Sequence, residues 1–327
     1  MAQTTSEVWD SRWTSTRRTV RPEVVDNFFD DYPVVDFFRR KGLQMTDTGG
    51  KEIQCNLESS GGTAEAFDKY DVLSKTPVDP FEAAFFKRRY YAVPVILSDT
   101  EDWENQGEAK VFDLMESLGN NAMKTIIAAI DADIHSAQSG KNMLGLQDII
   151  ADDGGGTVGG INSATSTFWA NQYDANGVTF TTQTVTNIFN GIEKWNDLLD
   201  ACESEGGKIK TLITTRSIAR SYRICLSSQG YGEVNLASVK GLGGPRLPSF
   251  YGANVIASNN CPSLHTYFVN TDTVRLNVLK QANFKKTPFT SLQSNGQLAQ
   301  LAYVVAGVQL TTNNRRRNGV HTAMTGN

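Results

Sequence analysis

Hydrophobic positions recur at helical spacing in two long stretches of the chain. The first lies between Ser98 and Gly140, where the apolar face comprises Val111, Met115, Leu118, Ala122, Ile126, Ile130 and Ile134. Ser98 and Glu101 have the spacing of a capping box, which marks a helix start. From Gly107 to Ser136 the pattern predicts a rod of about 45 Å, about twice the length of a typical globular helix. An ordinary long core helix would explain the periodicity equally well.

The remaining pattern predicts further helices and several strands. A second amphipathic helix fits Thr184 to Cys202 and stops before Gly206-Gly207, and a short one fits Ile218 to Leu226. Alternation predicts a strand from Tyr91 to Leu97, where Pro94 indicates an edge or a bulge. Other predicted strands lie at Leu212-Ile213, Val255-Ile256, Tyr267–Val269, Val274–Leu279 and Leu298–Leu310. This order predicts an α+β fold with a mixed or antiparallel sheet and excludes regular βαβ alternation.

The N-terminal part of the chain has no continuous core pattern. Residues 1–43 form an arm in which aromatic anchors stand among charges, so the arm must lie on its own body or on a neighbour. Residues 44–89 are polar and rich in glycine, and they predict a hairpin that turns near Gly61-Gly62 and returns through Tyr70 to Pro80. Because an isolated hairpin is marginal in water, this one needs another surface to pack on.

Composition narrows the functional classes. The chain has 327 residues, 39% hydrophobic content and a formal net charge of −4, values typical of a globular protein without a general attraction to nucleic acid. No apolar run is long enough to span a membrane, and the N-terminus has no signal-peptide core. Four widely spaced cysteines indicate reduced thiols. The basic clusters are interpreted as solvated faces or ion-pair networks; they are Arg17-Arg18, Arg39-Arg40-Lys41, Lys87-Arg88-Arg89 and Arg315-Arg316-Arg317.

No catalytic constellation emerges from the sequence. Gly154-x-Gly156-x-x-Gly159 matches the dinucleotide fingerprint in letters, but Asp152-Asp153 precede it and no helix pattern follows it. The three histidines are far apart in sequence; His135 is interpreted as a favourable charge at a helix end, and Asp131 and Asp133 as members of a solvated face. We therefore expect no catalytic residue, no metal ligand and no cofactor, and we expect that the protein is not an enzyme.

Two segments together resemble the major capsid proteins of tailed phages, which have the Hong Kong 97-type fold. Val93-Pro94-Val95 through Ser98-Asp99, followed by the long helix ending at Ile130–Ile134, resembles the start of their spine helix. Gly145–Ile150, then Gly159-Gly160-Ile161-Asn162-Ser163 and Phe168-Trp169, is similar to a stretch at the start of their axial domain. The order of arm, loop, helix and late strands also agrees with that family along the whole chain.

The resemblance implies a division of the chain. Residues 1–43 would be an N-terminal arm and residues 44–90 an extended β-hairpin loop. Residues 91–140 and 266–314 would form a peripheral domain with the spine helix, and residues 141–265 and 315–327 an axial domain. Because the sequence starts directly with the arm, a separate scaffolding protein or unaided assembly is implied. Lys51, Lys69 and Lys75 lie where some relatives crosslink, but crosslinking is not predicted.

The resemblance also implies a function and partners. The chain would assemble with copies of itself, as hexamers and pentamers, into an icosahedral shell around double-stranded DNA, inside the host cytoplasm and then in the virion. A scaffolding protein, a portal and a decoration protein are further expected partners, with weak non-specific DNA contact and no membrane. The expected assembly interface comprises Trp9, Trp13, Arg17, Phe28, Phe29, Gly61, Gly62 and Tyr70. An encapsulin-like compartment is the alternative, and a nucleotide-dependent enzyme using Gly154–Gly159 is a remote one.

Overall fold

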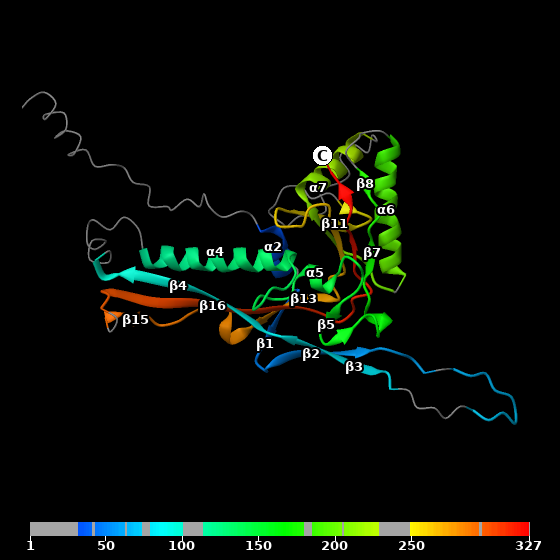
Figure 1. Cartoon of the computed structure of the whole chain (residues 1–327), viewed down its shortest axis with the longest axis horizontal. Helices are drawn as coiled ribbons and strands as arrows, with labels where there is room; N and C mark the ends of the chain where they lie inside the picture. Colours follow the sequence, from blue (N-terminus) through cyan, green and yellow to red (C-terminus); the bar gives the residue numbers. More distant parts are fainter. Residues whose placement is uncertain are drawn as a thin grey trace, which may run out of the picture.

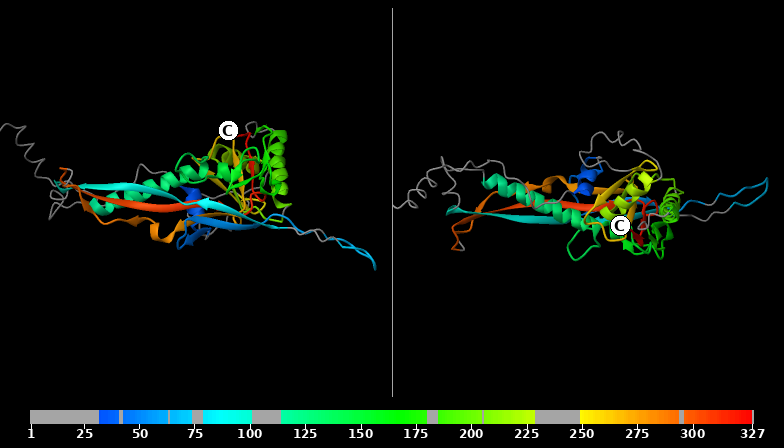
Figure 2. Two further views of the ribbon diagram at one scale, coloured as in Figure 1. Left: turned by 60° about the horizontal axis from the view of Figure 1, so that its bottom comes forward. Right: turned by 90° about the horizontal axis from the view of Figure 1, so that it is seen from above.

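The computed structural model describes residues 32–40, 43–62, 64–73, 79–100, 114–179, 185–204, 206–228, 249–293 and 296–326 (Figure 1). Two sheets of six strands organise this part of the chain, and a long hairpin projects from between them (Figures 1 and 2). None of the described helices combines the length and apolar character needed to cross a membrane.

The first sheet is built on the long strand β16 (Ala299–Thr312), and we call it the β16 sheet. Strand β4 (Arg89–Ser98) runs antiparallel along one side of β16. The other side pairs with β13 (Val274–Leu279), β14 (Lys285–Lys286) and β15 (Thr290–Ser291), and β1 (Gln44–Asp47) lies parallel to β13. Within the described residues β4 pairs only with β16, so it is an edge strand, as Pro94 predicted.

The long helix α4 (Leu114–His135) covers one face of the β16 sheet (Figure 1). Its predicted apolar face is confirmed, because Ala122, Ile126, Ile130 and Ile134 are all buried in one core with Val95 and Val304. The helix ends at His135 rather than continuing toward Gly140. Asp99 and Thr100 are helical, and residues 101–113 lie outside the described residues, so the predicted capping box at Glu101 remains a prediction.

The second sheet has the order β10-β11-β9-β12-β17-β7 and mixes parallel and antiparallel pairs; we call it the β9 sheet. Its strands are β7 (Gln172–Asp174), β9 (Thr211–Thr215), β10 (Ser249–Phe250), β11 (Ala253–Ser258), β12 (Thr266–Val269) and β17 (Gly319–His321). Helices α6 (Val185–Glu203) and α7 (Arg216–Ser228) share a core on one face, where Trp195 packs against Tyr222 at 5.0 Å between ring centroids. The other face, with Ile213 and Tyr267, joins the core of the β16 sheet.

Short elements connect the two sheets. Helix α5 (Leu146–Ile149), strands β5 (Thr157–Val158) and β6 (Ile161–Asn162), and the 3₁₀ helix η2 (Thr167–Trp169) follow α4. Strand β18 (Met324–Thr325) pairs with β8 (Val178–Thr179), and the 3₁₀ helix η4 (Lys280–Ala282) precedes β14. The predicted helices and strands from residue 184 onward are thus confirmed within the described residues.

The predicted hairpin forms between β2 (Glu52–Glu58) and β3 (Phe81–Lys87), which are antiparallel with Glu58 opposite Phe81. One further hydrogen bond, from the Ser59 amide to the Pro80 carbonyl at 2.7 Å, closes the ladder. Beyond it, residues 59–80 form a long projection without strand structure in its described part, and we call it the finger (Figures 1 and 2). The described residues between Tyr70 and Pro80 form no strand, and the returning strand begins at Phe81.

The end of the predicted arm packs into the subunit's own body. Helix α2 (Pro33–Arg40) buries Val34, Val35, Phe37 and Phe38 in the core that holds α4. The next strand, β1, belongs to the β16 sheet, although the pattern placed it in the projecting loop. For Phe37 and Phe38 the surface that covers the arm is thus its own body, whereas residues 1–31 lie outside the described residues.

Candidate functional site

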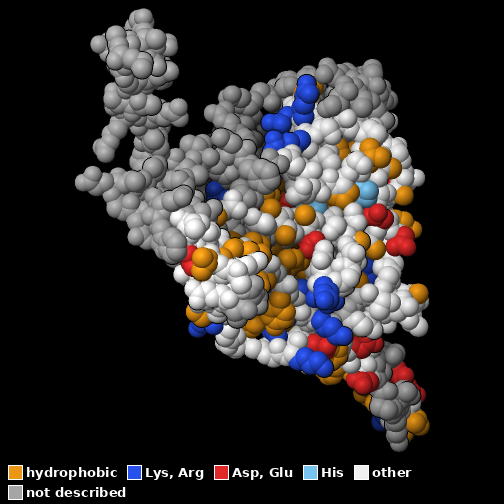
Figure 3. Space-filling view, turned by 60° about the vertical axis from the view of Figure 1, so that its left-hand side comes forward, with side chains coloured by type: hydrophobic (Ala, Val, Ile, Leu, Met, Phe, Trp, Pro, Cys, Tyr) orange, Lys and Arg blue, Asp and Glu red, His pale blue; other side chains and the backbone are white. Residues whose placement is uncertain are grey.

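The finger displays apolar side chains that are largely exposed. Phe67 is 69% exposed, and Tyr70 and Val72 are each 89% exposed. A local turn presents Tyr70, because the Asp68 carbonyl accepts from the Asp71 amide at 3.0 Å and the Asp71 carboxylate accepts from the Asp68 amide at 2.8 Å. Figure 3 shows acidic and hydrophobic side chains together on this projection at lower right. An exposed apolar cluster of this kind is typical of an interaction surface.

The root of the same hairpin is packed tightly. Ala84 and Phe86 of β3 and Leu57 of β2 share a small core with Val158, Ile161 and Trp169. The Phe85 amide donates to the Gly159 carbonyl at 2.9 Å, and the Trp169 Nε1 donates to the Val158 carbonyl at 3.0 Å. A Cβ at Gly159 would lie 2.7 Å from the Ala84 Cβ, so only glycine allows this approach. The Gly-Gly-Ile and Phe-Trp positions therefore form the seat of the projecting hairpin.

Arg315 ties this seat to the rest of the chain from a fully buried position. Its guanidinium donates to the carbonyls of Ile149 at 2.7 Å and Gly155 at 2.8 Å, and to the Asn171 Oδ1 at 3.1 Å. Burial lowers the pKa of Arg315 to about 10, while Asp153 and Asp148 act in the opposite direction. The prediction that Arg315 belongs to a solvated basic cluster is wrong, because its side chain is buried and links three separate segments by hydrogen bonds.

The glycine loop, residues 154–160, therefore has a structural role in packing. Gly154, Gly156, Gly159 and Gly160 all have positive φ, which glycine adopts without strain. The short strands β5 and β6 follow the loop's start, and no helix opens within it as a dinucleotide site requires. The hairpin root occupies one side of Gly159 and Arg315 binds Gly155. This geometry favours packing over nucleotide binding.

A second polar cluster lies at the C-terminal end of α4, where Asp131, Asp133 and His135 are buried. Tyr91 donates from its hydroxyl to Asp133, and the Asn142 amide group also donates to Asp133 at 2.9 Å. Asn260 donates to the Asp131 carboxylate at 2.8 Å. The interpretation of these aspartates as a solvated face is wrong. His135 is the last residue of α4, so its predicted place at the helix end is confirmed, and its side chain is buried there. The cluster joins α4 to β4 and to the β9 sheet.

The other two histidines lie near one another, which sequence distance did not indicate. Thr266, next to His265, pairs with His321 across β12 and β17. His265 Nε2 lies 3.2 Å from an Asp152 carboxylate oxygen, and burial lowers the pKa of His321. Across the described residues no group of three His, Cys, Asp or Glu side chains is arranged to hold a metal ion. Cys202 and Cys261 are buried, and burial raises the pKa of each thiol to about 12.

The outward face of the β4–β16 ladder is apolar and uncovered. Tyr90 is 61% exposed, Ile96 56% and Tyr303 42%. Ile96 lies opposite Leu301 and Pro94 opposite Tyr303, so these side chains form one continuous stripe. Figure 3 turns the free end of this ladder toward the viewer. The face opposite α4 is thus a second exposed apolar surface.

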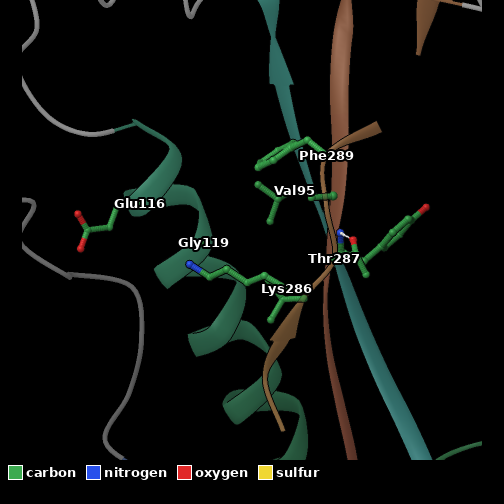
Figure 4. A pocket seen from close by; sticks show the side chains of 9 residues that line it. Val95, Glu116, Gly119, Lys286, Thr287 and Phe289 are labelled. Atoms are coloured by element: carbon green, nitrogen blue, oxygen red, sulfur yellow. Dashed lines mark hydrogen bonds between the residues drawn. The ribbon is translucent and has the colours of Figure 1, made fainter. Parts of the chain in front are cut away.

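A groove of about 280 Å³ opens beside this ladder, between α4 and the β16 sheet (Figure 4). Lys286 crosses it so closely that a Cβ at Gly119 would lie 2.8 Å from its Nζ. The Thr287 hydroxyl accepts a hydrogen bond from the Tyr303 amide at 2.8 Å, which fixes the groove wall. The groove is lined by Val95, Glu116, Gly119, Lys286, Thr287, Phe289, Ala302, Tyr303 and Val304.

The predicted interface residues divide into two groups. Trp9, Trp13, Arg17, Phe28 and Phe29 lie outside the described residues. Gly61, Gly62 and Tyr70 lie on the finger and are exposed, and their role in assembly stays a prediction. Phe67 and Val72 were not predicted as interface residues, although they are large apolar residues in a segment without a core pattern, which is a usable signal.

The chain shares its fold with solved shell proteins. The capsid subunit of cyanophage A-1(L) matches with a TM-score of 0.68 at 14% identity, covering 96% of this chain and 98% of that one. The capsid of a native GTA particle matches with a TM-score of 0.67 at 10% identity, covering 99% and 100%. The encapsulin of Synechococcus elongatus matches with a TM-score of 0.62 at 9% identity, covering 99% and 96%. No family model matches the sequence, and no curated protein matches it significantly.

The architecture therefore belongs to the class of α+β shell-protein folds. More particularly, the chain has the Hong Kong 97-type fold of tailed-phage major capsid proteins, as its sequence resemblance predicted. Because the identities are low, the likeness establishes the fold and leaves the function to be argued from the site.

Proposed function

We propose that this chain is a major capsid subunit that assembles with copies of itself into an icosahedral shell enclosing double-stranded DNA. The observation that carries the proposal is the finger, whose Phe67, Tyr70 and Val72 are 69%, 89% and 89% exposed. A monomer would gain nothing from a long projection that exposes such side chains to water. Burial against a neighbouring subunit would remove these side chains from water, and interfaces in shells are large enough to bury them.

The finger's chemistry fits a surface on another copy of the chain. Its described part carries Glu65, Asp68 and Asp71 beside the apolar side chains. The apolar stripe of the β4–β16 ladder lies beside Lys285, which is exposed and pairs with Val305 of β16. Apolar contact with opposite charge at the rim is the usual composition of a specific interface. The finger of one subunit would therefore lie along this face of its neighbour.

The domain division is part of this proposal. Residues 1–43 would act as the arm, 44–90 as the extended loop, 91–140 with 266–314 as the peripheral domain, and 141–265 with 315–327 as the axial domain. The burial of α2 in the core that holds α4, and the pairing of β1 within the β16 sheet, support a body that extends N-terminally into the first two segments. The seat at Gly159 and Arg315 would set the angle at which the loop leaves this body.

The proposed partners follow from the assembly. Copies of the chain would form hexamers and pentamers, with a scaffolding protein and a portal during assembly and a decoration protein on the finished shell. The net charge of −4 suits a container whose lining holds DNA weakly. Assembly would occur in the host cytoplasm and the product would be the virion capsid.

An encapsulin-like compartment is the second candidate, favoured by the 0.62 TM-score with the encapsulin of Synechococcus elongatus. Both candidates predict a closed shell, so the cargo distinguishes them. Nuclease-protected double-stranded DNA would favour the capsid, whereas an enclosed enzyme would favour the compartment.

Negative-stain electron microscopy of the purified chain tests the proposal. The chain would be expressed alone and together with any scaffolding gene encoded beside it. Closed shells or rings are the expected result. A monodisperse monomer or dimer under both conditions would refute the proposed function and direct attention to a ligand screen at the glycine loop.

A further inference from the structure

The two helices that cover the β9 sheet carry opposite charges on their outward faces. In α7, Arg216, Arg220 and Arg223 are all exposed and follow the spacing i, i+4, i+7, so they line one side of the helix. The helix contains no acidic residue. The Nε of Arg223 donates to the Ala219 carbonyl at 3.4 Å. Figure 3 shows a column of basic side chains at the top of the molecule, where α7 lies.

Helix α6 carries an acidic row with the same spacing. Glu193, Asp197 and Asp200 are exposed and again lie at i, i+4 and i+7. Lys194 lies beside this row, with its Nζ 3.5 Å from Asp197 and 3.8 Å from Asp174. The remaining two carboxylates, on Glu193 and Asp200, have no ion pair with any described side chain. The acidic row therefore keeps most of its charge available.

The two rows do not meet within one subunit. Helix α6 packs over β7 and β17 at one side of the β9 sheet, whereas α7 packs over β9 and β11 toward the other side (Figure 1). No ion pair links α6 to α7 among the described residues. The basic row of α7 and the acidic row of α6 therefore lie on opposite sides of the helical layer that covers the β9 sheet. In an assembly, each row would face a different neighbouring subunit.

We infer that the basic row of α7 in one subunit docks against the acidic row of α6 in the next copy. Equal spacing lets three arginines face three carboxylates, because successive members of both rows lie about 6 Å and 5 Å apart along their axes. Such a contact is heterologous, using two different patches, and a heterologous contact closes into a ring when its rotation permits. The inference rests on the proposed function, since it identifies what holds a capsomer ring together.

A second copy fits the basic row better than a nucleic acid does. The matching acidic row has the same number of charges, the same spacing and a place in the same layer of the same chain. Three exposed arginines alone would give only weak, salt-sensitive contact with phosphates. Electrostatic complementarity at such a contact would mainly set orientation and the rate of association.

Charge reversal tests the contact. The first variant is Arg216→Glu/Arg220→Glu/Arg223→Glu, the second is Glu193→Arg/Asp197→Arg/Asp200→Arg, and the third combines all six substitutions. We expect each single-helix variant to lower the yield of rings or shells about tenfold or more, because three attractions become three repulsions. The combined variant should restore assembly, because every contact is again attractive with its polarity exchanged.

The matched control for the α7 variant makes the same change in net charge elsewhere. Lys141, Lys208 and Lys280 are exposed and lie outside both helices, so Lys141→Glu/Lys208→Glu/Lys280→Glu should assemble like the wild type. Circular dichroism of dissociated subunits checks that every variant folds. If a reversed helix does not fold, the corresponding Arg→Gln or Asp→Asn and Glu→Gln set is used instead, with a smaller expected loss.

The outcomes separate this inference from the proposed function. Wild-type shells together with an α7-reversed chain that assembles like the lysine control would overturn the inference alone. If the variant with all six substitutions folds but does not regain assembly, the inference is also overturned. Intact α7-reversed shells that have lost bound double-stranded DNA would assign the row to nucleic acid instead. If sedimentation shows no self-association of the wild type, both proposals fail.

Discussion

The root and the finger of one hairpin show opposite uses of apolar residues. At the root, Ala84 and Phe86 are buried at 0% and 1% exposure against the glycine loop and Trp169. In the finger of the same hairpin, Tyr70 and Val72 are each 89% exposed. The root therefore stabilises the subunit, whereas the finger adds nothing to the subunit and would act only on another molecule. Substitutions in the two regions should separate folding from assembly.

The largest effect on folding is expected at Arg315. Arg315→Met removes a buried guanidinium and leaves the carbonyls of Ile149 and Gly155 without their donor. We expect the free energy of unfolding to fall by about 3 kcal/mol, measured by urea denaturation of dissociated subunits. The exposed neighbour Arg316 provides the control, and Arg316→Met should change stability by less than about 0.5 kcal/mol. Equal losses of unfolding free energy at both positions would contradict the structural role of the buried Arg315 hydrogen bonds.

A smaller loss is expected at Gly159, where the hairpin approaches the glycine loop most closely. Gly159→Ala would place a Cβ 2.7 Å from the Ala84 Cβ and would also strain a φ of +63°. We expect a loss of about 2 kcal/mol in unfolding free energy. Gly160→Ala strains a φ of +88° but meets nothing within 4 Å, so it isolates the cost of backbone conformation. If the two variants lose the same stability, close packing of the hairpin is not what requires Gly159.

Trp169 should show a still smaller effect. Trp169→Phe keeps an aromatic ring in the root core but removes the Nε1 donor to the Val158 carbonyl, now 3.0 Å away. Losing this buried hydrogen bond should lower the unfolding free energy by about 1–2 kcal/mol. Thermal unfolding followed by near-UV circular dichroism measures it. The neighbouring Phe168 is only partly buried, so Phe168→Tyr should leave the transition unchanged within error.

The sequence predicted most of the fold because local patterns determine most of it. The apolar face at Ala122, Ile126, Ile130 and Ile134 predicted α4, and alternation predicted β4 and β16. For the end of the arm, the sequence left two surfaces open, because the pattern of Phe37 and Phe38 shows that they are covered but not which surface covers them. Buried charge was missed for a similar reason. Arg315, Asp131 and Asp133 acquire their partners from segments that are distant in sequence, and a single sequence does not show such pairs.

The sequence predicted only the part of the candidate site that lies in a segment without a core pattern. Tyr70 and Gly61-Gly62 were selected because the loop has no core, and they do lie on the finger. The charge rows of α6 and α7 were present in the sequence as i, i+4, i+7 patterns. The inferred contact between these rows depends on the structure, which places both helices on one face of the β9 sheet with the two rows apart.

The smallest effect on stability, and the sharpest contrast with the root, is expected in the finger. Phe67→Ser/Tyr70→Ser/Val72→Ser removes side chains that are 69%, 89% and 89% exposed, so the unfolding free energy should change by less than about 0.5 kcal/mol. The same variant should form few shells in electron microscopy, because these side chains would be buried only between subunits. A control with Ala64→Ser/Ala66→Ser, also exposed on the finger, should assemble normally if the large apolar side chains rather than the chain path make the contact. Normal shells from the triple variant would remove the finger from the interface, and a stability loss as large as that of Arg315→Met would show that the finger packs on its own subunit.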